Sequence, residues 1–241
     1  MLKQRILLLL AALAALCGVL ALIIRPAPEP EYGGQNLSEW VIELVQPATS
    51  ATAADAIRQI GTNALPYLVE WVGYETPAWK NAISWTGKLL RQPRLQFIDH
   101  MKVCRSAGAM YAFKPLGVKA QREIGNLSRI ANDPTRTESR RGAMSALADI
   151  GVAALPTIVG VLTNEPNRTK ESRYLRVQCA IAISKLASED PDTARLAEPT
   201  LRRMCEETNA MTRAFATNTL RELDPERIER MRRLRKARED R

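Results

Sequence analysis

The sequence predicts an all-α protein built as an array of stacked helix pairs. Of its 241 residues, 46% are apolar and only 5% aromatic, which is typical of cores packed from Leu, Ile, Val and Ala. No stretch shows the sustained apolar–polar alternation of a half-buried strand. A short apolar step also recurs at nearly constant distance, and a period of about 20 to 50 residues indicates repeated supersecondary units.

The first 25 residues predict a single N-terminal transmembrane helix. Ile6 to Ile24 is an unbroken run of 19 residues without charge or proline, and a helix of about 20 apolar residues spans a bilayer core. Lys3 and Arg5 precede the run, so we expect the short N-terminus in the cytoplasm and the rest of the chain outside it. Cleavage of a signal peptide, giving a secreted protein, is the alternative.

Residues 26–36 follow as a proline-rich tether. Its sequence opens Pro26-Ala27-Pro28-Glu29-Pro30-Glu31, and repeated prolines prevent a helix and favour an extended polyproline II segment. We expect the helical repeat domain to occupy residues 37–238.

The recurring step has the form apolar-x-x-apolar and marks the first helix of each unit. Its copies are Ile57/Ile60, Met110/Phe113, Leu147/Ile150, Ile183/Leu186 and Leu220/Leu223. From Phe113 onward the second members lie 37, 36 and 37 residues apart, whereas the first interval is 53 residues. Four residues before each step stands a small residue, which lets a neighbouring backbone approach closely: Ala53, Ser106, Ala143, Cys179 and Ala216.

The start of the second helix is clearest in two copies, 90 residues apart. Gly61 and Gly151 each follow the step, and Leu-Pro begins four residues after each glycine, at Leu65-Pro66 and Leu155-Pro156. Glycine is the favoured left-handed residue after a helix, and proline suits a first helical turn. Leu196-Ala197-Glu198-Pro199 repeats the proline 43 residues beyond Pro156, after a longer acidic turn.

Arginine recurs seven residues before the step in the last three units, at Arg140, Arg176 and Arg213. These arginines are expected near the start of each first helix, one above another along the array. Acidic neighbours such as Glu138, Glu171 and Glu207 are candidate ion-pair partners, and a solvated arginine in the first helical turn is the alternative.

An extra helix is expected at about residues 77–91, because the first interval is longer than the others. This stretch holds Trp79, Trp85 and Leu89-Leu90. Packing into the core is the interpretation that we favour for these tryptophans.

The small-x-x-x-apolar-x-x-apolar-Gly phrase followed by x-x-Ala-Leu-Pro resembles the HEAT-type helical repeat, including its PBS-lyase-like variety. More narrowly, Tyr32-x-Gly34-x-x-Leu37-Ser38-x-Trp40 just after an anchor looks like bacterial anchored HEAT-repeat proteins of unassigned function. The resemblance implies an α-solenoid of about five helix pairs, lying in the periplasm. It covers roughly residues 32–238, with Lys114-Pro115-Leu116-Gly117 breaking the pattern.

The net charge of +9 is local rather than global. Residues 26–75 carry one basic and seven acidic groups, whereas residues 76–129 carry ten basic and two acidic ones. The basic stretch either neutralises the acidic N-terminal part or forms an anion-binding face for a partner. The candidate residues of that face are Lys88, Arg91, Arg94, Lys102, Arg105, Lys119 and Arg122.

We expect no catalytic, cofactor-binding or metal-binding residues. The chain has one histidine, His100, no C-x-x-C pair and no phosphate-binding G-x-x-x-x-G-K-[ST] motif.

The function that these observations favour is a non-enzymatic, membrane-tethered interaction scaffold. Its expected partner is a protein or another envelope component. Some HEAT-like folds bind or repair DNA, but the near-neutral body and the export segment argue against nucleic acid. A lyase-like or chaperone-type HEAT protein is the third possibility, suggested only by the name of the repeat variety.

Overall fold

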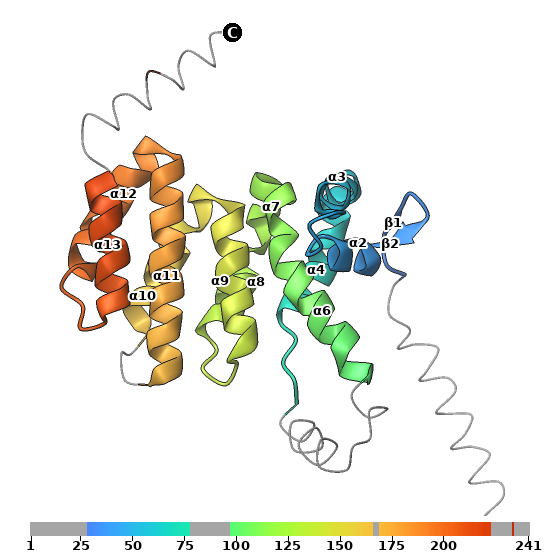
Figure 1. Ribbon diagram of the computed structural model, residues 1–241, viewed down its shortest axis with the longest axis horizontal. Helices are drawn as coiled ribbons and strands as arrows, with labels where there is room; N and C mark the ends of the chain where they lie inside the picture. The colour runs from blue at the N-terminus through green and yellow to red at the C-terminus, as the bar shows by residue number, and fades with distance from the viewer. Residues whose placement is uncertain (1–27, 78–96, 166–168, 223–232, 234–241) are drawn as a thin grey trace, which may run out of the picture.

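The structure, a computed structural model, describes residues 28–77, 97–165, 169–222 and 233. Helices form most of this part of the chain, which confirms the predicted all-α class. Figure 1 shows the helices following one another along the long axis in chain order, from α2 (Leu37–Glu43) to α13 (Ala210–Glu222).

The predicted anchor and most of the predicted extra helix lie outside the described residues. Within the described ranges, no helix is both long enough and apolar enough to cross a bilayer.

A small β-hairpin, which the sequence analysis did not predict, lies near the start of the described residues. Strands β1 (Glu31–Tyr32) and β2 (Gln35–Asn36) pair antiparallel, joined by Gly33-Gly34 with φ of 61° and 80°. Two glycines with positive φ are the preferred loop of a two-residue hairpin. Trp40 of α2 donates its indole N–H to the Tyr32 carbonyl at 3.0 Å, so residues assigned to the tether pack on the helical body.

The first helix pair follows the predicted phrase. Helix α3 (Ser50–Ile60) buries Ala53, Ile57 and Ile60, which share one helix face. Gly61 then adopts φ of 65°, a short 3₁₀ turn η1 (Gly61–Ala64) follows, and α4 (Leu65–Val72) starts with proline in its first turn.

The second pair departs from the predicted register by three residues. It comprises α6 (Phe97–Tyr111), α7 (Phe113–Leu116), η3 (Gly117–Glu123) and α8 (Ile124–Asn132). The predicted Ser106 and Met110 are only half-buried, whereas Ala109, Phe113 and Leu116 are buried. Gly117 follows with φ of 49°.

Pro115 is the physical reason for this shift. A helical proline lacks the N–H that would bond the carbonyl four residues earlier and its ring clashes there, and α6 ends at that residue, Tyr111. Lys114-Pro115-Leu116-Gly117 therefore ends the first helix of this pair. The equivalent residue to Ile150 is Leu116, 34 residues before it, rather than Phe113.

The third pair matches its prediction. Helix α9 (Glu138–Ile150) buries Ala143, Leu147 and Ile150, and Gly151 has φ of 103°. The 3₁₀ turn η4 (Val152–Ala154) leads into α10 (Leu155–Asn164).

The last helices are α11 (Lys170–Glu189), α12 (Pro191–Met204) and α13. Cys179, Ile183 and Leu186 are buried in α11 as predicted, and Ala216 is buried in α13. The expected helix start near Pro199 is wrong, because α12 begins at Pro191 and runs through Pro199. Asp190 explains the earlier start, since its carboxylate accepts the Thr193 N–H at 2.9 Å and caps the helix.

The first helices of successive pairs pack on one another, and one continuous cluster of buried apolar residues runs through the stack. Helix α9 lies between α6 and α11, α11 also contacts α13, and α8 contacts α10. The small residues Ala109, Ala143 and Cys179 of these first helices are fully buried.

We expect Gly151→Ala to lower the free energy of unfolding by about 2 kcal/mol, because φ of 103° with ψ of −157° is a region nearly restricted to glycine. No other atom lies within 4 Å of an added Cβ there, so the loss reports backbone strain alone. Gly125→Ala is the matched control. Its Cβ also meets nothing within 4 Å and its φ is not positive. Equal urea midpoints for the two variants would contradict the assignment.

Candidate interaction groove

The structure does not gather the predicted basic residues into one described face. Lys88, Arg91 and Arg94 lie outside the described residues. Lys119 and Arg122 lie on η3, where the Arg122 guanidinium donates to the Thr62 carbonyl at 2.8 Å and pairs with Glu123 at 3.4 Å.

Lys102 and Arg105 lie instead on α6, beside aromatic residues. The Lys102 ammonium is 5.8 Å from the centre of the Tyr74 ring, and the Arg105 guanidinium is 5.5 Å from that of Trp71. These distances are typical of cation–π contacts. Arg105 also pairs with Glu29 at 3.6 Å, a contact of the kind that the first interpretation of the basic stretch expects.

A second set of charges is more regular, and we call it the arginine ladder: Arg140, Arg176 and Arg213. The first two are only 7% and 8% exposed. Each arginine donates to carbonyls at the end of the preceding second helix, where helical carbonyls lack N–H partners, or in the turn just after it. The acceptors are Ala131 for Arg140, Leu162 and Glu165 for Arg176, and Glu207 and Thr208 for Arg213, all at 2.7 to 2.8 Å.

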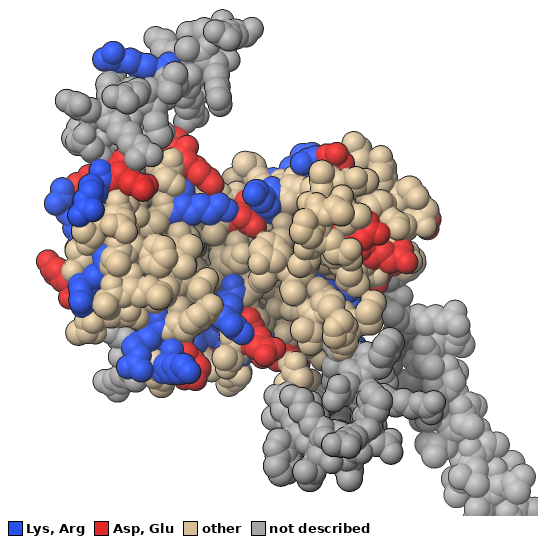
Figure 2. All heavy atoms as spheres, in the orientation of Figure 1, with Lys and Arg blue, Asp and Glu red and all other residues tan. Residues whose placement is uncertain are grey.

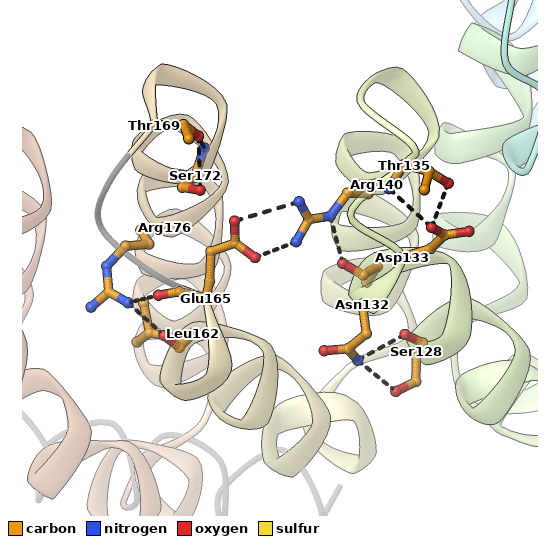
Figure 3. Close-up of polar contacts among 11 residues, drawn as sticks. Ser128, Asn132, Asp133, Thr135, Arg140, Leu162, Glu165, Thr169, Ser172 and Arg176 are labelled. Carbon is orange, nitrogen blue, oxygen red and sulfur yellow. Dashed lines mark hydrogen bonds and ion pairs between the residues drawn. The ribbon is translucent and has the colours of Figure 1, made fainter.

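Two glutamates connect the arginines into a continuous chain of contacts. The Glu165 carboxylate forms a two-pronged ion pair with Arg140 while its backbone carbonyl accepts from Arg176, as Figure 3 shows. Glu207 repeats this arrangement: its carboxylate pairs with Arg176 and its carbonyl accepts from Arg213. Glu207 was a predicted partner, whereas Glu138 and Glu171 make no described ion pair with the ladder.

Glu165 was missed although the sequence held a signal for it. Glu75 precedes Glu165 by 90 residues, the same offset that relates Gly61 to Gly151. Glu75 also reaches the start of a first helix, accepting from the Ser139 N–H and hydroxyl at 2.8 Å each.

Beside the ladder lies an open groove of about 830 Å³, which we call the ladder groove. The N-terminal turns of α9 and α11 and the start of α13 form its walls. Its lining includes two half-exposed apolar side chains, Tyr174 at 48% and Met211 at 58%. The Arg141 guanidinium lies 5.4 Å from the centre of the Tyr174 ring.

The ladder groove is more basic than acidic. Figure 2 shows several Lys and Arg side chains at the lower edge of the molecule, with Asp and Glu beside some of them. The charged lining residues are Arg136, Arg140, Arg141, Lys170, Arg173, Glu165 and Glu171. Arg136 pairs with Asp133 at 3.0 Å and Arg140 pairs with Glu165. Arg141, Lys170 and Arg173 then face the single carboxylate of Glu171, which leaves an excess of positive charge. An acidic partner segment with an apolar side chain complements this lining.

The described thiols are all free. Burial raises the pKa of Cys179 to about 12, so this thiol stays protonated near neutral pH and is a poor nucleophile. Cys104 lies beside His100, with its sulfur 3.6 Å from Nδ1, a contact that their spacing of one helical turn permits. In the described ranges no carboxylate contacts that imidazole, and no cluster of metal-ligating side chains forms.

We expect Cys179 to resist thiol reagents in the folded protein. At pH 8 a disulfide reagent should modify Cys104 and Cys205, which are partly exposed, and leave Cys179 unmodified until denaturant is added. Mass spectrometry of the digested protein separates the three sites. Modification of Cys179 at the rate of Cys205 would contradict its burial in the α11 contact.

Comparisons with known proteins add no relative. No family model, no curated protein and no solved structure significantly matches this chain.

Proposed function

We propose that this chain is a non-enzymatic, membrane-tethered interaction scaffold built of HEAT-like repeats, which binds an acidic segment of a protein partner in the ladder groove. The observation that carries the proposal is the groove itself. The starts of α9, α11 and α13 line it, and Arg141, Lys170 and Arg173, which form no ion pair within the described residues, adjoin the exposed Tyr174 and Met211.

The repeat architecture is supported by the recurrence of one local structure. A small residue, two apolar residues and a glycine of positive φ end α3, the α6–α7 segment and α9 alike. A 3₁₀ turn and a second helix follow each time. Units that stack through such equivalent contacts form a solenoid. In this proposal the pairs α3/α4, α6–α7/α8, α9/α10 and α11/α12 are four repeat units, and α13 begins a fifth.

The membrane anchor is supported by the sequence of residues 1–25. A run of 19 apolar residues is long enough to cross a bilayer, and the basic residues before it favour an outward-facing body. An extracytoplasmic, periplasmic location follows from that orientation.

Charge reversal in the groove tests the binding function. The groove reversal combines Lys170→Glu and Arg173→Glu, which change two exposed groove residues. The control variant combines Lys119→Glu and Arg122→Glu, which make the same change in charge on η3. A photoreactive residue at Tyr174 in the membrane-bound chain should cross-link one discrete partner, and only the groove reversal should abolish the product. Equal yields from both variants would refute the groove as the binding site.

A further inference from the structure

The chain is fixed to the helical body from its first described residue onward. The Tyr67 hydroxyl of α4 donates to the Pro28 carbonyl at 2.9 Å. The Glu29 carboxylate accepts the Ser38 N–H at 3.1 Å and pairs with Arg105 of α6 at 3.6 Å. Residues 28–36, which we call the strap, are therefore part of the folded body rather than a free linker.

This attachment leaves very little free tether. The apolar run ends at Ile24, and the three residue steps from Arg25 to Pro28 span at most about 11 Å when fully extended. A body joined so closely to a bilayer has only one end within reach of it, the end where the strap lies against α4 and α6.

We propose that this end of the body, the surface around Pro28 formed by Tyr67, Tyr74, Met101 and Lys102, rests on the phospholipid headgroups of the membrane. The proposal depends on the anchor in the proposed function and adds an orientation. The α4–α6 end faces the lipid, and α13, at the opposite end of the molecule in Figure 1, points away from it.

The chemistry of this surface suits headgroups that carry both charges. A cavity of about 480 Å³ is lined by Lys102 and Arg105 together with Glu29, Glu70 and Glu75. Cations beside carboxylates complement the adjacent phosphate and ammonium groups of a zwitterionic lipid better than they complement an anionic surface.

Apolar and aromatic groups accompany these charges. Met101 shares a face of α6 with Arg105, one helical turn away, and is 49% exposed. Tyr67, Trp71 and Tyr74 line the same cavity, and Tyr and Trp are the side chains enriched at membrane–water interfaces.

Two exposed methionines at opposite ends of the molecule provide a matched pair of probe sites. Met101→Cys and Met211→Cys, 49% and 58% exposed in the wild type, are each labelled with a fluorophore in the full chain after Cys17, Cys104 and Cys205 are changed to Ser. The protein is placed in phosphatidylcholine nanodiscs that contain a lipid with a nitroxide on its headgroup. Because the free tether spans about 11 Å, we expect about fivefold stronger quenching at position 101 than at position 211.

A longer tether is the control that separates lipid contact from other causes. Ten Gly/Ser residues inserted between Arg25 and Pro26 add an r.m.s. length of about 17 Å, so quenching at position 101 should fall towards that at position 211. Equal quenching at both positions, in protein that co-elutes with nanodiscs, overturns the inference and leaves the anchor intact. Protein that elutes apart from nanodiscs overturns both the inference and the anchor.

Discussion

Gly108→Ala is expected to destabilise the protein more than alanine at any other glycine in the described part of the chain. An alanine Cβ at this position of α6 would lie 2.1 Å from the Val41 carbonyl oxygen and 2.7 Å from its Cγ1. The first of these contacts is with backbone, which cannot rotate away. Helices α2 and α6 must therefore separate. Overpacking of this kind lowers the free energy of unfolding by about 3 kcal/mol.

Gly160→Ala is the matched control for this experiment. Gly160 also lies inside a helix, α10, and its added Cβ meets no atom within 4 Å. Replacing glycine by alanine in a helix interior stabilises it by about 1 kcal/mol where space allows. Urea unfolding followed by circular dichroism should show the two midpoints moving in opposite directions, and a tolerated Gly108→Ala would show that α2 does not pack on α6 as described.

Arg176→Met is expected to lower the free energy of unfolding by about 3 kcal/mol, because it removes one partner of a buried ion pair. Arg176 is 8% exposed, and its loss leaves the Glu207 carboxylate and the carbonyls of Leu162 and Glu165 without their donor. Burial lowers the pKa of Arg176 from its ordinary value, but a guanidinium remains charged in proteins. The pair is therefore present throughout the physiological pH range.

Arg202→Met is the control for the ladder, because it breaks an exposed ion pair. The Arg202 and Glu198 side chains are 71% and 45% exposed, and such pairs contribute about 0 to 1 kcal/mol. A double-mutant cycle with Glu207→Gln measures the coupling of Arg176 to Glu207. A coupling near zero, or an equal cost for Arg176→Met and Arg202→Met, would show that the ladder does not hold the units together.

The sequence phrase predicted the fold best where helix ends are marked by local chemistry. Ala53, Ile57 and Ile60 with Gly61, and Ala143, Leu147 and Ile150 with Gly151, are buried or terminal as expected. Their spacing encodes both the buried face and the left-handed helix end. The hairpin escaped prediction because two-residue strands show no alternation.

The register predicted for the second helix pair was wrong because two apolar steps overlap in its sequence. Met110/Phe113 and Phe113/Leu116 both fit the pattern, and the even spacing of about 37 residues favoured the wrong one. Only the bend that Pro115 imposes between α6 and α7 selects Leu116.

The candidate site was predicted in part for a similar reason. The spacing identifies Arg140, Arg176 and Arg213, but the candidate partners Glu138, Glu171 and Glu207 are simply acidic neighbours in the sequence. Glu165 and Glu207 follow the second helices, so the pairing depends on packing between elements that are about 25 to 31 residues apart in sequence. Counting charges along the chain identifies the basic stretch. It does not identify Arg141, Lys170 and Arg173, because residues 130–225 have a net charge of zero.

The claim on which every functional proposal here depends is that residues 6–24 anchor the helical body on the outer side of a membrane. Protease accessibility of the full chain in intact spheroplasts tests it most directly. We expect the chain to resist carbonate extraction and the helical body to be digested from outside, leaving only a short protected N-terminal fragment. A body that stays intact until the membrane is permeabilised, or a chain released by carbonate, would contradict the claim.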